Sequence, residues 1–195
     1  MQSKKLKELL KHYESSKRII DSRLKEFDKK FSQKELFQEL CFCLLTANTS
    51  SKMASKVMSS IGKVIFIGSE EEIREKLHSL SCRFYNRRAH FIYCAQKVPI
   101  KLDRDYLVKN FKGIGYKEAS HFLRNVGVGD YAILDKHILN NLIEFGVIKK
   151  IPTSLNRERY LEIEEKMRKF SKKIKILMNE LDLVLWSRMT GEVLK

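Results

Sequence analysis

The strongest constraint on the fold of this chain is a helical spacing of apolar residues that recurs along most of its length. One set is spaced i, i+3, i+4, i+7 and i+8: Phe37, Leu40, Cys41, Leu44 and Leu45. Such spacing places its members on one buried face of a helix. The capping-box pair Ser32 and Glu35 precedes this set, so we expect a helix over about 33–46.

Further helix signals follow in order along the chain. The capping-box pair Ser69 and Glu72 predicts a short helix to about Leu80. The segment NTSSKMASKVMSSIG is typical of a helix capped by hydroxyls and closed by glycine. The segment FYNRRAHFIYCAQKV predicts a helix that ends before Pro99, and two long helices are expected after Pro152.

Only Val64–Ile67 is strand-like, and it has no apparent strand partner. An isolated strand cannot satisfy its backbone hydrogen-bonding groups, so we expect an all-α fold. With 195 residues and 43% hydrophobic content, the chain can bury a real core as one domain or as one domain with two lobes.

The charge balance points to a polyanionic partner. Thirty-nine Lys and Arg residues against 24 Asp and Glu residues leave a net charge of +15. Nucleic acid is the expected partner rather than a membrane, because the sequence has no apolar run near the roughly 18 residues needed to span one, and no lipidation motif. A basic surface without function, as in a heat-adapted protein, is the alternative. The N-terminal segment lacks the features of a secretory signal, so a cytoplasmic location is expected.

The cysteines predict neither a disulfide framework nor a metal centre. Cys41, Cys43, Cys82 and Cys94 lie in apolar or helical runs, where they are expected as small buried hydrophobic residues. Their spacing does not match a zinc site, and the last hundred residues contain no cysteine for an iron–sulfur loop. We therefore expect no metal and no cofactor.

The segment FKGIGYKEASHFLRNVGVGDYAILDKHIL, Phe111–Leu139, carries the functional signal. Helix-like runs flank Gly113-Ile114-Gly115, which predicts a helix–hairpin–helix. The second helix would present free N–H groups that can bind a DNA phosphate without reading sequence. A glycine turn that serves only geometry is the alternative. Asp135 precedes an apolar-periodic run and is expected to cap a helix.

This window resembles the helix–hairpin–helix and Gly/Pro–Asp signature of the DNA base-excision glycosylase superfamily. The superfamily pattern reads Leu-Pro-Gly-(Val or Ile)-Gly-x-Lys-x-Ala, followed by Val-Asp-x-His-(Val or Ile). Here the matching stretches are Phe111–Ala119 and Leu134–Ile138. Lys112 replaces the usual proline, which puts the rigidity of the hairpin in doubt.

Within the superfamily, the chain resembles the type 2 8-oxoguanine DNA glycosylase/lyases from about Phe37 to Lys195. The resemblance rests on LLTANTS at Leu44–Ser50, RFYNRRAHFI at Arg83–Ile92 and the ending WSRMTGEVLK. It implies two helical lobes with the active-site cleft between them. One lobe is expected at 33–128, and the other at 1–32 together with 129–195.

The resemblance also implies a mechanism on double-stranded DNA that contains an oxidised purine. The damaged nucleotide flips out of the duplex, and Lys117 attacks C1′ with help from Asp135. The resulting Schiff base allows β-elimination of the 3′ phosphate. Lys117 must lose its proton to attack, although the ordinary pKa of lysine is about 10.4. No membrane is involved, and a monomer is expected.

Several other residues are expected to contact a DNA phosphate, to recognise the base or to pack in the core. Gly113 and Gly115 are expected to face a DNA phosphate. Trp186 is expected in the core or, by resemblance, in the base pocket, and Phe84 is expected in the core with base recognition as the alternative. Lys195 is implied to accept, through its terminal carboxylate, a hydrogen bond from N7–H of 8-oxoguanine. His137 is expected to pack rather than to transfer protons.

Two alternative functions remain. A non-catalytic helix–hairpin–helix DNA-binding module would need the glycines and the basic surface, but not Lys117 and Asp135 at this spacing. A pyrimidine-lesion glycosylase/lyase of the endonuclease III kind would use the same lysine on a different base.

Overall fold

A computed structural model of the chain describes residues 2–193 and is helical throughout the elements it defines. In chain order the helices are α1 (Gln2–Phe27), α2 (Gln33–Thr46), α3 (Ser51–Ile61), α4 (Val64–Ile67), α5 (Glu70–Ser79), α6 (Tyr85–Ala95), α7 (Arg104–Asn110), α8 (Tyr116–Asn125), α9 (Lys136–Glu144), α10 (Arg157–Ile174) and α11 (Met178–Thr190). The described residues contain no strand. The predicted all-α fold is therefore confirmed.

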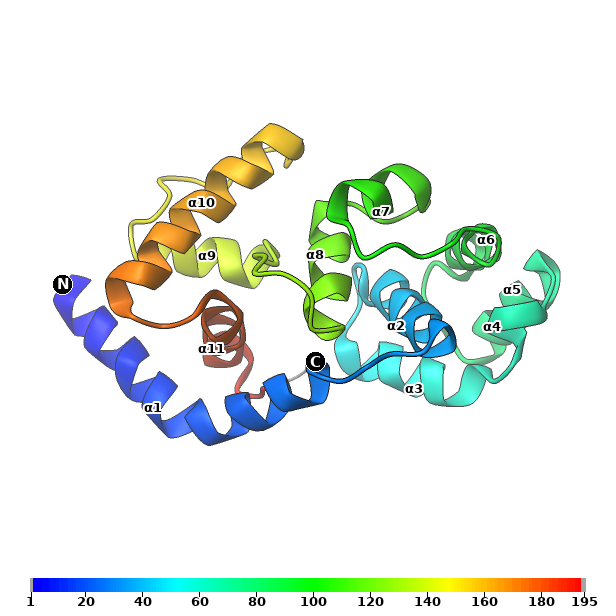
Figure 1. Cartoon of the computed structure of the whole chain (residues 1–195), viewed down its shortest axis with the longest axis horizontal. Coiled ribbons are helices and arrows are strands. Elements are labelled where there is room, and N and C mark those ends of the chain that lie inside the picture. Colours follow the sequence, from blue (N-terminus) through cyan, green and yellow to red (C-terminus); the bar gives the residue numbers. More distant parts are fainter. Residues whose placement is uncertain (1, 194–195) are drawn as a thin grey trace. The chain divides into compact units, whose positions relative to one another are not determined.

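The chain divides into two compact units. We call Lys30–Val126, which contains α2 to α8, the central unit. The terminal unit combines the residues through Lys29 with those from Gly127 onward, and it contains α1, α9, α10 and α11. Figure 1 shows the chain leaving the terminal unit after α1 and returning to it after α8.

The central unit is built around α2, which packs against α3, α6 and α8 (Figure 1). The helix begins at the predicted capping box, in which Ser32 and Glu35 bond each other's backbone N–H groups. Its run from Glu39 to Leu45 is buried all round, as expected for a helix enclosed by others. The one carboxylate in that run, Glu39, accepts a hydrogen bond of 2.7 Å from Asn125 of α8. Burial of this polar group is thereby compensated.

The terminal unit is built in the same way around α11, which packs against α1, α9 and α10. Nearly all residues from Met178 to Leu185 are buried. Asn141 of α9 is fully buried and donates hydrogen bonds to the carbonyl oxygens of His137 and Leu185, at 2.9 Å and 3.1 Å. Asn141 therefore fixes α9 against α11.

The strand-like run Val64–Ile67 forms the short helix α4, in agreement with the expected all-α fold. With no strand available to pair with, the segment satisfies its backbone locally, and Gly68 N–H donates to the carbonyl of Val64 at 2.9 Å. Ile65 is buried, whereas Ile67 is 83% exposed. The helical geometry of α4 therefore buries Ile65 but leaves the apolar side chain of Ile67 exposed.

Candidate active site

The predicted helix–hairpin–helix is present in the central unit. α7 and α8 pack against each other and are joined by residues 111–115. Ile114 is buried and anchors the turn. Gly113 has φ +82°, and a Cβ atom there would lie 2.3 Å from the ring of Phe91. Only glycine fits this position, because both the backbone conformation and the close approach of the ring exclude a side chain.

The start of α8 has no side-chain cap, because its N-cap is Gly115, which has no side chain to bond the first N–H groups. Helix N-termini bear free N–H donors and the positive end of the helix dipole. The hairpin therefore places a helix N-terminus without a side-chain cap beside Lys117, the second residue of α8.

Lys117 is half-buried, with 31% of its side chain exposed, and its Nζ lies 2.9 Å from Oε1 of Glu118. The other oxygen of Glu118 lies 3.3 Å from the position that a Cβ on Gly115 would occupy. The Glu118 carboxylate thus folds back over the N-terminus of α8 while it holds the Lys117 ammonium.

Lys112, which stands where the superfamily has proline, contacts α6. Its Nζ lies 3.2 Å from Nε2 of His90, and Nδ1 of His90 lies 3.0 Å from the carboxylate of Glu70. An ammonium must donate, so Nε2 accepts and the neutral ring donates from Nδ1 to Glu70. Together with Phe91, this contact braces the hairpin against α6. The hairpin turn is therefore supported by contacts with α6, although Lys112 stands in place of the usual proline.

Asp135 caps α9 in the terminal unit, as predicted. Its Oδ1 accepts a hydrogen bond of 2.8 Å from the backbone N–H of Ile138. The preceding segment is fixed by α10, since the Tyr160 hydroxyl donates to the Ala132 carbonyl at 2.6 Å and Glu164 accepts from Ala132 N–H at 2.8 Å. The Asp135 carboxylate is therefore held in a defined place, and within residues 2–193 no group bonds its second oxygen.

The terminal unit brings Trp186 close to this cap. Trp186 is half-buried on α11, and its ring meets the edge of His137 with centroids 6.2 Å apart and planes at 79°. His137 is two residues after Asp135, so the Trp186 ring lies near the start of α9. The expected packing role of His137 is confirmed by this contact.

Phe84 does not belong to the core, so that expectation was wrong. The side chain is 50% exposed, and its backbone is left-handed with φ +57°. The guanidinium groups of Arg83 and Arg88 lie 5.1 Å and 5.8 Å from its ring centroid. An exposed aromatic ring beside two cations suits stacking on a nucleic-acid base better than core packing.

Sequence reasoning missed Arg88, which is only 3% exposed. Its guanidinium donates to the carbonyl of Ala47 at 2.6 Å, the hydroxyl of Thr49 at 3.2 Å and the Sγ of Cys82 at 3.2 Å. These bonds tie the loop after α2 to the loop that carries Phe84. The available signal was its position, because Arg88 falls on the same helical stripe as the buried Ala89, Ile92 and Ala95.

The site residues are thus distributed over both units. Lys117, Gly113, Gly115 and Phe84 belong to the central unit, whereas Asp135 and Trp186 belong to the terminal unit. Lys195 lies outside the described residues.

Within residues 2–193, no group of His, Cys, Asp and Glu side chains is arranged to hold a metal ion. None of the described helices has both the length and the apolar character needed to cross a membrane.

Comparison with known proteins gives concordant matches over most of the chain. Residues 20–176 match the family model for 8-oxoguanine DNA glycosylase. The chain is 47% identical over 189 residues to the 8-oxoguanine DNA glycosylase/AP lyase of Korarchaeum cryptofilum, covering 91% of this chain and 90% of that protein. It is 45% identical over 192 residues to the enzyme of the same name from Methanocaldococcus jannaschii, covering 92% and 93%.

Two solved structures are similar to the fold described here. The 8-oxoguanine DNA glycosylase of Thermotoga maritima matches with a TM-score of 0.93 and 39% identity over the full length of both chains. The Methanocaldococcus jannaschii 8-oxoguanine glycosylase/lyase, in complex with DNA containing 8-oxoguanine, matches with a TM-score of 0.89 and 42% identity. That match covers 96% of this chain and 99% of the other.

Proposed function

Because this chain belongs to the 8-oxoguanine DNA glycosylase family, we propose that it excises 8-oxoguanine from double-stranded DNA and then cleaves the strand as an AP lyase. The observation that carries the proposal is the place of Lys117. It is a half-buried amine in the first turn of the helix that follows the glycine hairpin, next to the helix end suited to a phosphate. Both relatives compared above are named 8-oxoguanine DNA glycosylase/AP lyase, which covers the same two activities.

The first chemical step is base release. The damaged nucleotide leaves the stack, and the neutral Lys117 amine forms a bond to C1′ while the N-glycosidic bond breaks. The electron pair of that bond leaves with the base, which takes up a proton. Asp135, fixed in position at the N-cap of α9, stabilises the positive charge that develops on the sugar.

The second step cleaves the strand. Ring opening converts the lysine adduct to a Schiff base, in which the iminium carbon makes the C2′ proton acidic. Loss of that proton forms a double bond and expels the 3′ phosphate, which leaves with the electron pair of the C3′–O bond. Since one chain supplies both Lys117 and Asp135, we propose that a monomer is sufficient.

Four further residues receive supporting roles. Gly113 and Gly115 let a phosphate approach the N-terminus of α8, where the N–H groups bind without reading sequence. Trp186, beside the α9 cap, supplies an aromatic face to the displaced base, and the exposed Phe84 ring contacts bases of the duplex.

The substrate is tested by incubating the protein in parallel with duplexes that contain 8-oxoguanine, thymine glycol or an unmodified guanine at the same position. The proposal predicts base release and strand cleavage on the 8-oxoguanine duplex alone. Preferential release of thymine glycol would assign the chain to the pyrimidine-lesion class. Tight binding without release from either lesion would support a non-catalytic module.

A further inference from the structure

A groove runs along α10 in the terminal unit, at the end of α9 remote from Asp135. It lies between α10 and the turn at residues 145–152, and it consists of two adjoining hollows of about 530 and 320 Å³. Both hollows are lined by Gly146, Val147 and Lys166. The nine residues of α9 span about 13 Å, so an occupant of this α10 groove would leave the Asp135 carboxylate accessible.

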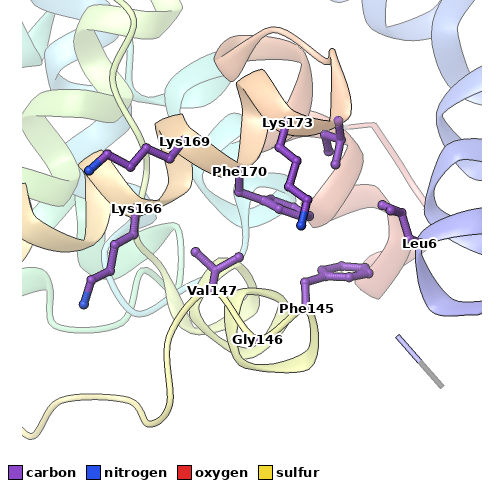
Figure 2. Close-up of a pocket in the computed structure, with 9 residues that line it drawn as sticks. Leu6, Phe145, Gly146, Val147, Lys166, Lys169, Phe170 and Lys173 are labelled. Atoms are coloured by element: carbon purple, nitrogen blue, oxygen red, sulfur yellow. The ribbon is translucent and has the colours of Figure 1, made fainter. Parts of the chain in front are cut away.

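The floor of the α10 groove is apolar. In the larger hollow, the rings of Phe145 and Phe170 stack with centroids 5.5 Å apart, beside Leu6 of α1 (Figure 2). Ile148, Pro152 and Ile163 line the smaller hollow. Apolar floors of this volume are typical of sites that bury a ligand's apolar groups, and a phosphate backbone has none to bury.

The rim of the groove is strongly basic. Six cations line it against the single carboxylate of Glu162: Lys149, Lys150, Arg159, Lys166, Lys169 and Lys173. All six are exposed. Glu162 binds Lys166 at 2.7 Å and Arg159 at 3.7 Å, but Lys149, Lys150 and Lys173 form no salt bridge with any residue from 2 to 193. The rim therefore presents uncompensated positive charge above an apolar floor.

The wall opposite α10 is preformed. Gly146 has φ +70° and closes α9, with its N–H donating to the Ile143 carbonyl at 2.9 Å. Val147 N–H donates to the Leu142 carbonyl at 2.8 Å. A partner would therefore bind without first ordering this turn, which favours affinity.

The aromatic floor is not a platform for base stacking. Phe145 is only 9% exposed, Phe170 already stacks on its ring, and the Arg188 guanidinium lies 5.3 Å from its centroid. A base would find no open ring face on Phe145. Aliphatic or aromatic side chains of a peptide need only the apolar hollows, and its carboxylates would match the lysine rim.

We propose that the α10 groove docks an acidic, amphipathic segment of a partner protein, with one or two apolar side chains in the hollows and Asp or Glu side chains on the lysine rim. This function is separate from lesion excision and uses none of the site residues assigned above. Its consequence is that the chain can hold a protein partner while its catalytic residues remain free.

The test is selection from a phage library of random peptides of about twelve residues on the immobilised full-length chain. The proposal predicts enrichment of sequences that combine Asp or Glu with large apolar residues. Lys173→Glu should weaken binding of a synthetic, fluorescent copy of the enriched peptide by about tenfold or more. The matched control is Lys172→Glu, which makes the same charge change on the exposed neighbouring residue of α10 outside the groove.

Excision of 8-oxoguanine by Lys173→Glu should stay within about twofold of the unchanged protein, as expected for a charge outside the site. Enrichment of no peptide, or of peptides that Lys173→Glu and Lys172→Glu bind equally well, would overturn the proposal. Binding of a fluorescent single-stranded oligonucleotide would also overturn the proposal under two conditions. Lys173→Glu, but not Lys172→Glu, would have to weaken that binding, and the peptide would have to fail to displace the oligonucleotide. Concentration-dependent dimerisation lost only in Lys173→Glu would assign the groove to a second copy of the chain, and would equally overturn it.

Discussion

Lys117 is held in an ion pair by the residue that follows it, with its Nζ 2.9 Å from a carboxylate oxygen of Glu118. The pair ties the amine to a carboxylate, whereas attack on C1′ requires an amine that is free to reach the sugar. Glu118 also covers the N-terminus of α8, where a phosphate is expected. DNA binding is therefore expected to displace Glu118 and release the amine.

Replacement of Glu118 by glutamine removes the charge and keeps the shape. Base release should then be faster than in the unchanged protein, because the amine no longer has to leave an ion pair before it attacks. A partly exposed ion pair contributes about 1 kcal/mol or less, so the gain at neutral pH should be up to about fivefold. Single-turnover base release measured at neutral pH checks this. A strong loss of rate would instead make Glu118 the proton acceptor.

Asp135→Asn separates capping from catalysis, because asparagine caps helices about as well as aspartate. The melting temperature should change little, while base release should slow by about 10²- to 10³-fold, as when an electrostatic stabiliser is removed. Asp103→Asn is the matched control, since Asp103 caps α7 by the same bond, accepted from Tyr106 N–H at 2.7 Å. Equal effects of the two substitutions on activity would reduce Asp135 to a cap.

Phe84→Gly should leave stability nearly unchanged, because the side chain is half exposed and glycine tolerates the left-handed backbone. Affinity for a lesion duplex should fall by about 1 to 3 kcal/mol, the usual contribution of an aromatic ring stacked on a base. Thermal denaturation and fluorescence anisotropy with non-cleavable DNA measure the two quantities. A protein that melts earlier but binds DNA normally would place Phe84 in a structural role.

The ion pair between Glu144 and Arg188 is expected to stabilise the fold less at acidic pH. Two hydrogen bonds of 2.7 Å from Arg188 join α9 to α11, and they hold the pKa of Glu144 below its usual 4.5. A carboxylate with a lowered folded-state pKa stabilises the fold above its unfolded pKa, and this stabilisation is lost as pH falls through the folded value. Glu144→Gln should therefore cost about 1 to 2 kcal/mol at neutral pH, and progressively less below pH 4.5. Denaturant unfolding at several pH values would detect this, and a cost independent of pH would contradict it.

Local signals predicted most of the helices. The capping boxes at Ser32 and Ser69 and the cap at Asp135 depend on residues within one turn of each other, so the sequence contains all the information needed. The hairpin was predictable for the same reason, because Gly113 and the buried Ile114 act within a five-residue turn.

Features that depend on distant residues were not predictable. The burial of Arg88 requires the Ala47 carbonyl, 41 positions away in the chain, and the α10 groove requires α1, α9 and α10 to pack together. The exposed Phe84 has a left-handed backbone. Glycine and asparagine are the usual sequence signals of that conformation, and neither stands at this position. The Glu118 contact was missed because adjacent residues on a helix do not usually face each other.

Covalent capture of the lysine adduct tests the central claim most directly. Borohydride added during reaction with an 8-oxoguanine duplex should reduce the Schiff base and leave a stable protein–DNA adduct, which peptide mapping should place at Lys117. Lys117→Gln should form no adduct and yet bind DNA normally, and Lys109→Gln, an exposed lysine of α7, should be trapped like the unchanged protein. An adduct that persists in Lys117→Gln, or no adduct with the unchanged protein despite base release, would contradict the assignment of Lys117 as the nucleophile.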